Sequence, residues 1–331
     1  MTTRPPQGFP LPDLVLVANR VLKQEAEALR AALDEFSNAP RPGCPWEQDD
    51  RAVSGHAGPE AQGRARLLAL TRHQAMLIYI NAYDHLLTLG RVLGGDGAMP
   101  VFSYASLSRV VCEAAVRCAW LMDPGISSEE RIVRGAVALW VSADERLKGA
   151  RRLPAQRFDG RVLRQMLDSC TAERDAIEDL ITGAGLTFGY SQNGRAKARL
   201  ELVPGVSVSL KINVSDLMAE LLPESPSWYN IGSSVAHSHF WGLREVENSN
   251  PGGPRAITPN VLTVGAAAES AISAAGLILD RCARCYGHDP SALLWRTRQR
   301  REAIDFLMRR AVTSSWVLIP TEPQRRVSGG G

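Results

Sequence analysis

The stretch Val261–Leu279, VLTVGAAAESAISAAGLIL, is the longest weakly polar run in the chain and decides its fold class. Alanine, serine and glycine make up much of it, and Glu269 stands in its middle. A helix that spans a membrane needs about 20 predominantly apolar residues with few or no charges. The small residues and the central glutamate instead favour a helix in the core of a helical protein, and we expect no membrane association.

Helical periodicity recurs on both sides of this run. Within 59–93, apolar residues return at intervals of three and four, as on one face of an α-helix. The residues 37–58 are rich in Pro, Gly and Asp, which predicts a loop. Similar periodicity predicts further helices at 12–36, 103–122, 127–151, 159–182, 260–286 and 289–312, and another that begins at Pro226.

The segment 186–213 breaks the helical pattern. It alternates in places and contains three glycines and one proline, so both a small hairpin and an ordered loop stay open. No linker between 59 and 312 is long enough to separate two cores. The sequence therefore predicts an all-α multi-helix bundle with a small irregular or hairpin insertion around 186–213. We expect a single domain over 12–312, with disordered tails at 1–11 and 313–331.

The composition is that of an ordinary globular protein. Of the 331 residues, 45% are hydrophobic and 22% are charged, and the net charge of +3 is too small to indicate a polyanion-binding surface over the whole protein. Arginine binds phosphates and carboxylates in a bidentate manner, so a local site for an anionic partner stays open. Lysine is rare among the 38 basic residues and occurs only as Lys23, Lys148, Lys197 and Lys211.

The six cysteines do not form the pattern of a metal or redox site. Cys282 and Cys285 make a CxxC, but a zinc site needs a second such pair or nearby histidines. Most of the others fall within helical patterns, where a free cysteine behaves as a small hydrophobic residue. The N-terminal segment lacks the charged and apolar regions of a secretory signal. We expect a reduced, cytoplasmic protein with no metal and no cofactor.

A stripe of charge follows the predicted helix 103–122. Arg109, Glu113 and Arg117 recur at four-residue intervals, while the rest of the helix surface is almost entirely apolar. Because an unpaired buried charge costs several kcal/mol, we predict that Arg109 and Glu113 are largely buried and paired. A solvent-exposed stripe is the alternative. Asp84 and His85, late in the helix 59–93, are candidate partners, since at least one of them should point inward.

A second concentration of polar and aromatic residues lies at 228–241, WYNIGSSVAHSHFW. On a helix, Tyr229, Ser233 and His237 share one face, and Asn230 lies beside them. A serine on a helix, without a strained turn or an oxyanion hole, is a poor nucleophile, so we expect Ser233 to have a structural role.

His237 is the candidate acid–base group of this stretch, because it lies at the end of the predicted helix, where side chains commonly face clefts. His239 lies about 200° further around a continued helix. Together the two histidines lack the third ligand of a metal site. We predict that replacing His237 by alanine abolishes the activity or binding, and that replacing His239 leaves most of it.

The run LSRVVCEAAVRCAWLMDPGISSEERIVRGA (107–136) resembles a group of actinobacterial helical proteins of the DUF5677 type, and more distantly the HEPN-like superfamily. The shared pattern is an Arg-x3-Glu helix, then Trp-Leu, Asp-Pro and an arginine-bearing helix. The Asp84-His85 pair and the Tyr-x3-Ser-x3-His segment from Tyr229 to His237 also match, and the resemblance covers about residues 70–290.

The resemblance implies a helical protein, as a homodimer, that binds or cleaves RNA in stress or defence. HEPN-like nucleases carry an Arg-x4-6-His motif whose histidine acts on the RNA backbone. His237 occupies the matching place, whereas Tyr229 and Asn230 stand where the arginine is expected. In this interpretation His237 is the general acid and base, Arg109 stabilises the phosphate charge and Asn230 positions it.

Two other interpretations stay open, and the sequence does not decide whether the chain is an enzyme. In the first, a pocket between helices binds a small anionic ligand, as is usual in bundles. Arg109 then holds a carboxylate and Glu113 or His237 moves a proton. In the second, the same residues form a buried structural network. The full candidate set is His237, Arg109 and Glu113 for catalysis, with Asp84, His85, Tyr229, Asn230 and Ser233 for binding.

Overall fold

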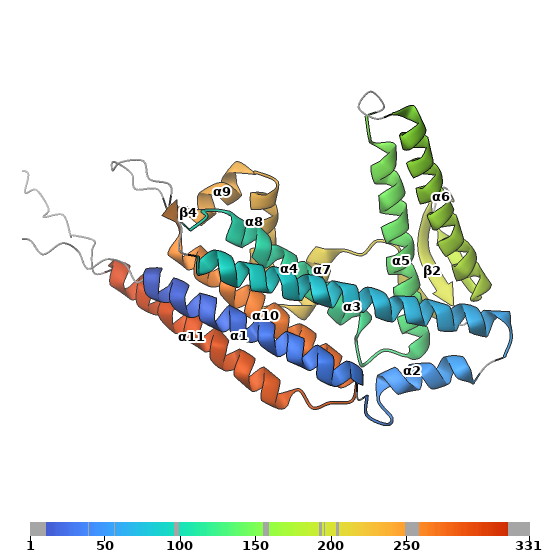
Figure 1. The fold of residues 1–331 in the computed structure, drawn as a ribbon, viewed down its shortest axis with the longest axis horizontal. Coiled ribbons are helices and arrows are strands. Elements are labelled where there is room, and N and C mark those ends of the chain that lie inside the picture. Colours follow the sequence, from blue (N-terminus) through green and yellow to red (C-terminus); the bar gives the residue numbers. More distant parts are fainter. Residues whose placement is uncertain are drawn as a thin grey trace, which may run out of the picture.

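The computed structural model describes residues 11–38, 40–55, 57–95, 99–154, 159–191, 194, 196–202, 205–248 and 258–316 (Figure 1). The helices in these ranges are α1 (Leu11–Asn38), α2 (Pro45–Ser54), α3 (Pro59–Leu93), α4 (Ser103–Leu121), α5 (Ser128–Arg151), α6 (Gly160–Gly183), α7 (Val214–Leu221), α8 (Pro226–Ala236), α9 (Phe240–Val246), α10 (Val261–Cys285) and α11 (Ser291–Trp316). The strands are β1 (Leu186–Tyr190), β2 (Lys197–Leu202), β3 (Val206–Ser209), β4 (Glu247–Asn248) and β5 (Thr258–Pro259).

The predicted all-α bundle is confirmed, since helices dominate the described chain and the sheets are small. The five central predicted helices agree with α3, α4, α5, α6 and α10 to within one residue at each end. Helix propensity and apolar periodicity are properties of the local sequence, which explains this agreement.

The body of the molecule consists of α1, α3, α4, α10 and α11, which pack side by side (Figure 1). α10 packs against α1, α4 and α11, and most of its alanines are buried, Ala267 and Ala271 completely. Small residues let the neighbouring helices approach closely: a Cβ atom on Gly276 would lie 2.8 Å from Cγ2 of Thr297 in α11. α10 is long and apolar enough to cross a membrane, but 72% of its most apolar window is buried inside the protein.

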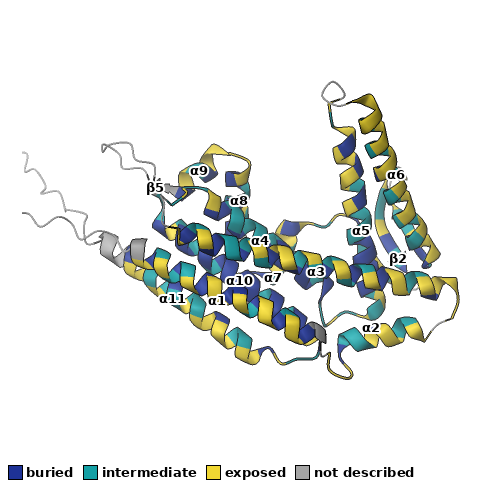
Figure 2. Cartoon of the chain, in the orientation of Figure 1, coloured by how far each residue is buried: buried dark blue, intermediate teal, exposed yellow. Residues whose placement is uncertain are grey.

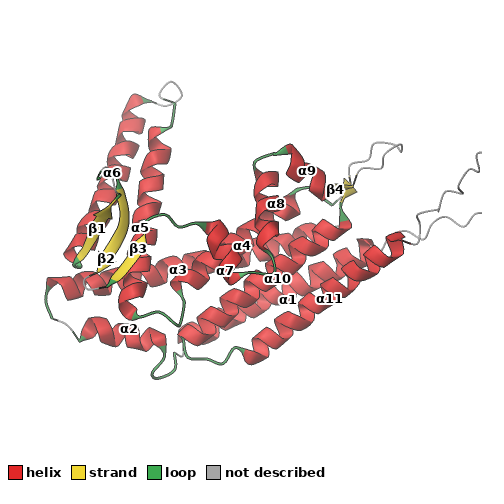
Figure 3. Cartoon of the chain, turned by 180° about the vertical axis from the view of Figure 1, so that it is seen from behind, coloured by secondary structure: helices red, strands yellow, loops and turns green. Residues whose placement is uncertain are grey.

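The arm of the molecule consists of α5, α6 and the sheet of β1, β2 and β3, and it projects from the long axis of the body (Figures 1 and 3). Leu67 and Leu68, near the start of α3, join Ile132 and Val133 of α5 in a hydrophobic core that lies apart from that of the body. α3 therefore contributes to both cores. α6 is the most exposed part of the arm, with few buried side chains along its length (Figure 2).

The insertion at 186–213 is a three-stranded antiparallel sheet in the order β1-β2-β3. Leu186 pairs with Leu202, and Leu200 pairs with Val208. Leu186, Leu200 and Leu202 are buried in the core of the arm, so the alternation in the sequence places one face of the sheet inward.

The prediction of a loop over 37–58 is wrong in its second half, where α2 forms. Pro45 occupies the first turn of α2 and Glu47 lies nearby, a favourable start for a helix. A contact with another helix also stabilises α2, because its buried Asp49 pairs with Arg131 of α5. The predicted C-terminal tail begins too early, since α11 continues to Trp316. Leu11, assigned to the N-terminal tail, is the first residue of α1. The remaining tail residues, 1–10 and 317–331, lie outside the described residues.

Candidate functional site

The predicted charged stripe of α4 is paired but only partly buried. Arg109 lies 3.4 Å from Glu113, between Nη2 and Oε2, and Arg117 lies 3.1 Å from the other oxygen of Glu113. The exposed fractions of the Arg109 and Glu113 side chains are 21% and 27%. The prediction of pairing is confirmed, and the prediction that both residues are largely buried holds only in part, because each side chain keeps some contact with water. The opposite faces of α4 are fully covered because α3 and α10 pack there, and the stripe lies on the less covered side.

Arg109 is held against α8. Its guanidinium carbon lies 5.3 Å from the centre of the Tyr229 ring. A Cβ atom on Gly232 would lie 2.7 Å from Cβ of Arg109 and 2.9 Å from the carbonyl oxygen of Ala105, so α8 crosses α4 at close range. Arg109 thus joins two helices and already has a carboxylate and an aromatic ring as neighbours.

The other predicted site residues do not join this group. His237 is exposed at the C-terminal end of α8, with its ring centre 6.0 Å from that of His239. His85 contacts the carbonyl oxygen of Asn81 in its own helix at 2.9 Å, and Asp84 is exposed. Asn230 is exposed and Ser233 is half-buried. Among the described residues, no hydrogen bond or ion pair joins His237, Asp84 or His85 to Arg109 or Glu113.

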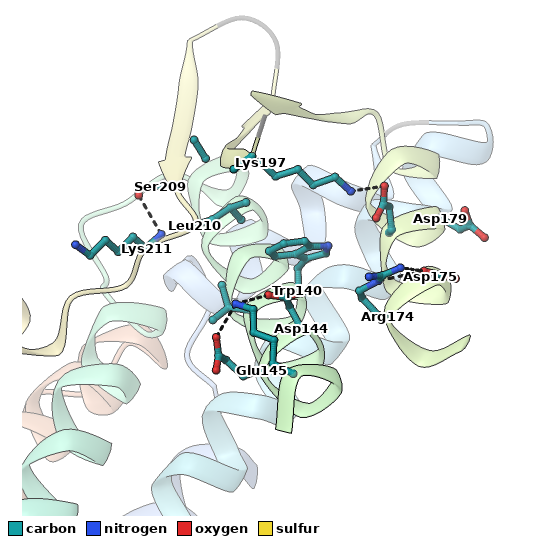
Figure 4. Close-up of a pocket in the computed structure, with 15 residues that line it drawn as sticks. Trp140, Asp144, Glu145, Arg174, Asp175, Asp179, Lys197, Ser209, Leu210 and Lys211 are labelled. Atoms are coloured by element: carbon teal, nitrogen blue, oxygen red, sulfur yellow. Dashed lines mark hydrogen bonds and ion pairs between the residues drawn. The ribbon is translucent and has the colours of Figure 1, made fainter. Parts of the chain in front are cut away.

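A cavity of about 1080 Å³ lies in the arm (Figure 4). We call it the α5–α6 cleft. α5 presents one face to it, in which charged residues follow Trp140 at four-residue intervals, and α6 presents a second charged face. The lining residues are Trp140, Val141, Asp144, Glu145 and Lys148 of α5, Arg174, Asp175, Glu178 and Asp179 of α6, and Ala196, Lys197, Ala198, Ser209, Leu210 and Lys211 of the sheet and the turn that follows it.

Most charges of the α5–α6 cleft are paired across short distances. Lys148 contacts Asp144 at 2.8 Å and Glu145 at 2.9 Å, and these hydrogen bonds raise the pKa of the Lys148 ammonium. Arg174 binds Asp175 at 2.6 Å. These pairs are solvent-accessible, so each one contributes little to stability.

Lys197 is fixed between two aromatic rings and a carboxylate. Its ammonium contacts Glu178 and lies 4.1 Å from the ring centre of Phe188 and 5.6 Å from that of Trp140. The rings of Trp140 and Phe188 are 5.7 Å apart. Nε1 of Trp140 is buried and has no hydrogen-bond partner among the described residues. Trp140 therefore contributes an aromatic face to the cleft, while its N–H group is buried away from it.

Lys211 and Asp179 differ from the other charges, because neither takes part in an ion pair within the described chain. Figure 4 shows them at opposite sides of the cleft, with Trp140 between them and with the charged end of each directed away from Trp140. The lining residues include five carboxylates and four cationic side chains, so their formal charge is −1. Lys211 and Asp179 are thus two exposed charges at the edges of the cleft.

The distribution of lysine in the sequence is a signal for this cleft that no motif carries. Three of the four lysines of the chain, Lys148, Lys197 and Lys211, line it, although arginine is far more frequent elsewhere. Lysine carries a compact point charge on a flexible stem, whereas arginine presents a wide planar group. Most of the compact cations of the chain therefore lie at one site, together with Arg174.

A buried ion pair lies where α2, α3 and α5 meet. Nε of Arg131 is 2.8 Å from Oδ2 of Asp49, and both side chains are 2% exposed. Arg131 also donates to the carbonyl oxygen of Leu121, and Arg72 stacks on Trp46 with its guanidinium carbon 3.7 Å from the ring centre. These side chains are enclosed by the surrounding helices, so we assign them a structural role.

Within the described ranges, no group of three histidine, cysteine, aspartate or glutamate side chains is placed to hold a metal ion. No family model, no curated protein and no solved structure matches this chain.

Proposed function

We propose that this protein binds a small zwitterionic molecule in the α5–α6 cleft. The observation that carries the proposal is the pair of unpaired charges, Lys211 and Asp179, on opposite sides of a cleft lined by three of the four lysines. A ligand with a carboxylate and an ammonium group can pair with both. The volume of about 1080 Å³ is ample for such a molecule.

The charge of the cleft argues for a zwitterion and against a polyanion. A nucleic acid presents a phosphate at every nucleotide and is bound by an excess of cations. The cleft has a formal charge of −1, and its cations alternate with carboxylates. Such an arrangement attracts a molecule with both signs of charge and repels a strand of phosphates.

The first test is a titration calorimetry series with glycylglycine, its N-acetylated form and its C-amidated form. Capping removes one ligand charge at a time. We expect the free dipeptide to bind and each capped form to bind about tenfold more weakly, since a charge-assisted contact contributes about 1.5 kcal/mol. Equal binding of all three forms, or of none, would contradict the proposal.

Two variants assign the ligand charges to residues. Lys211→Gln should weaken the binding of the free dipeptide and leave that of the amidated form, whose carboxylate is already absent. Asp179→Asn should weaken the binding of the free dipeptide and leave that of the acetylated form, whose ammonium is already absent. Lys23→Gln is the matched control, because Lys23 is the one lysine outside the cleft and is exposed on α1.

RNA binding is the second candidate function, and the observation that favours it lies on α11. Trp295 and Phe306 are 60% and 64% exposed, and Arg296 and Arg298 are exposed on the same helix. Aromatic side chains between cations are typical of surfaces that bind single-stranded nucleic acid. A gel-shift series with a single-stranded RNA at rising salt tests it: Arg296→Gln and Arg298→Gln should weaken binding and reduce its salt dependence.

A further inference from the structure

A second cavity, of about 470 Å³, lies between α3, α4 and α5. We call it the α3–α5 cleft. Seven of its twelve lining residues are apolar, among them Leu77 and Ile78 of α3, Trp120 and Leu121 of α4, and Ala138 and Val141 of α5. Leu77 is 53% exposed, so part of this apolar lining lies in contact with water. Sites for small molecules commonly have a volume of about 300–1,000 Å³ and a mostly apolar lining, and this cleft has both properties.

Two of the residues that line the α3–α5 cleft are charged, Arg117 of α4 and Glu145 of α5. The side chain of Glu145 is 62% exposed, and its carboxylate contacts the ammonium of Lys148 at 2.9 Å. Glu145 therefore already has a cation as its partner. Arg117 is then the charge of the cleft that an anionic ligand would meet.

Arg117 belongs to a group of side chains with a surplus of positive charge. Each oxygen of the Glu113 carboxylate contacts one guanidinium, that of Arg109 at 3.4 Å and that of Arg117 at 3.1 Å. Two cations thus share one carboxylate, and the three side chains carry a formal charge of +1. Arg109 packs against Tyr229, whereas Arg117 is more exposed, 38% against 21%, and lines the cleft.

The guanidinium of Arg117 has the geometry to bind a further carboxylate. Within the described chain, its hydrogen bond to Glu113 uses Nη2. A guanidinium carries five N–H donors in a planar fork, which matches the two oxygens of a carboxylate. A second carboxylate at Arg117 would balance the surplus charge of the group, because two guanidiniums would then face two carboxylates.

We infer that the α3–α5 cleft binds an amphipathic carboxylate of the medium-chain fatty acid type. The carboxylate pairs with Arg117, and the aliphatic chain lies against the apolar residues of α3, α4 and α5. Contact with the chain removes the apolar surface of Leu77 from water, which is favourable. This second site does not depend on the proposed function.

Titration calorimetry with four ligands tests the inference. Octanoate should bind about tenfold more tightly than octanamide, because the amide lacks the charge that Arg117 pairs with. Each buried CH₂ group should tighten binding by about fourfold, so octanoate should bind at least about tenfold more tightly than butyrate. Octylammonium, which has the opposite charge, should bind no more tightly than octanamide.

Two variants place the ligand in the cleft. Arg117→Gln should lower the affinity for octanoate to that for octanamide and leave octanamide binding unchanged. Ala138→Leu narrows the cleft from α5 and should weaken the binding of both. Arg51→Gln is the matched control, since Arg51 also pairs with a glutamate one turn away, Glu47 at 2.7 Å, but lies on α2 and does not line the cleft. Thermal unfolding checks the fold of each variant.

Several outcomes would overturn the inference. Equal affinities for octanoate and octanamide would show that the charge of Arg117 does not select the ligand. Tighter binding of octylammonium would show that the ligand meets Glu145 instead. Octanoate binding that neither Arg117→Gln nor Ala138→Leu weakens would place the ligand elsewhere, and no binding at all would leave the cleft without this role. Glycylglycine binding is measured separately, so each of these results leaves the proposed function standing.

Discussion

The body and the arm of this molecule use charged residues in opposite ways. In the body, a charge can be enclosed between helices with its partners: Glu25 of α1 is completely buried and accepts hydrogen bonds from Thr297 and Arg300 of α11. In the arm, charges line an open cleft, where most pairs are half-exposed and two charges are unpaired. The same residue types therefore join helices in one region and line an open cleft in the other.

The difference follows from the packing available to each region. The small residues of α10 let α1, α4 and α11 approach until little space remains between them. A charge that enters this interior must be paired, because an uncompensated buried charge is far more costly than an exposed one. α5 and α6 pack against each other and the sheet, but the charges at their cleft stay partly exposed to water. Substitutions of charged residues should therefore cost much stability in buried clusters and little in the α5–α6 cleft.

The largest expected effect is at the junction of the two regions. Asp49→Ala leaves the guanidinium of Arg131 buried without its carboxylate, and breaking such a pair costs about 3–5 kcal/mol. Urea denaturation should show this loss in the free energy of unfolding. Asp144→Ala in the cleft is the comparison, and it should cost about 1 kcal/mol or less. Similar losses of unfolding free energy in the two variants would show that buried and exposed charge pairs contribute equally to stability here.

The second expected effect is a pH dependence that originates in the body. Burial raises the pKa of Glu25 above its ordinary value of 4.5, and the hydrogen bonds from Thr297 and Arg300 only partly offset this. The folded state then binds the proton more tightly than the unfolded chain does. The resulting stabilisation is complete below the unfolded pKa and is lost as the pH rises through the higher folded pKa.

Glu25→Gln removes this titration. The unfolding free energy of the wild-type protein minus that of Glu25→Gln should therefore decrease as the pH rises upward from about 4.5. Denaturation at several pH values measures the difference. A difference that increases over this range would show that the ion pair with Arg300 outweighs burial and that Glu25 is ionised at lower pH than we infer.

The third effect lies between these extremes, because the Arg109–Glu113–Arg117 stripe is neither enclosed nor fully open. Glu113→Ala should cost about 1 kcal/mol, since its two partners retain contact with water. A loss of about 3–5 kcal/mol, as expected from sequence for a buried stripe, would show that this part of α4 is sealed in solution.

The sequence predicted the features that depend on neighbours along one helix. The contact of Arg109 with Glu113 needs only a four-residue interval, and the burial of α10 follows from its composition. α2 was missed because its Asp49 is stabilised by Arg131, far away in the sequence. The α5–α6 cleft was missed for the same reason: Lys148, Lys197 and Asp179 meet only after α5, α6 and β2 have assembled. Their spacing along the chain carries no periodic signal.

The smallest expected effect concerns His237. The resemblance to HEPN-like proteins assigns it the proton transfer in RNA cleavage, whereas the structure places it in solvent beside His239, at the end of α8. Exposed side chains outside such networks usually change stability by less than about 0.5 kcal/mol. We expect His237→Ala and His239→Ala to unfold like the wild type and to bind glycylglycine with unchanged affinity, because neither lines the α5–α6 cleft. An RNA cleavage assay tests the alternative. If the wild type cleaves RNA, His237→Ala abolishes the cleavage and His239→Ala retains it, the activity lies at the end of α8, outside the arm.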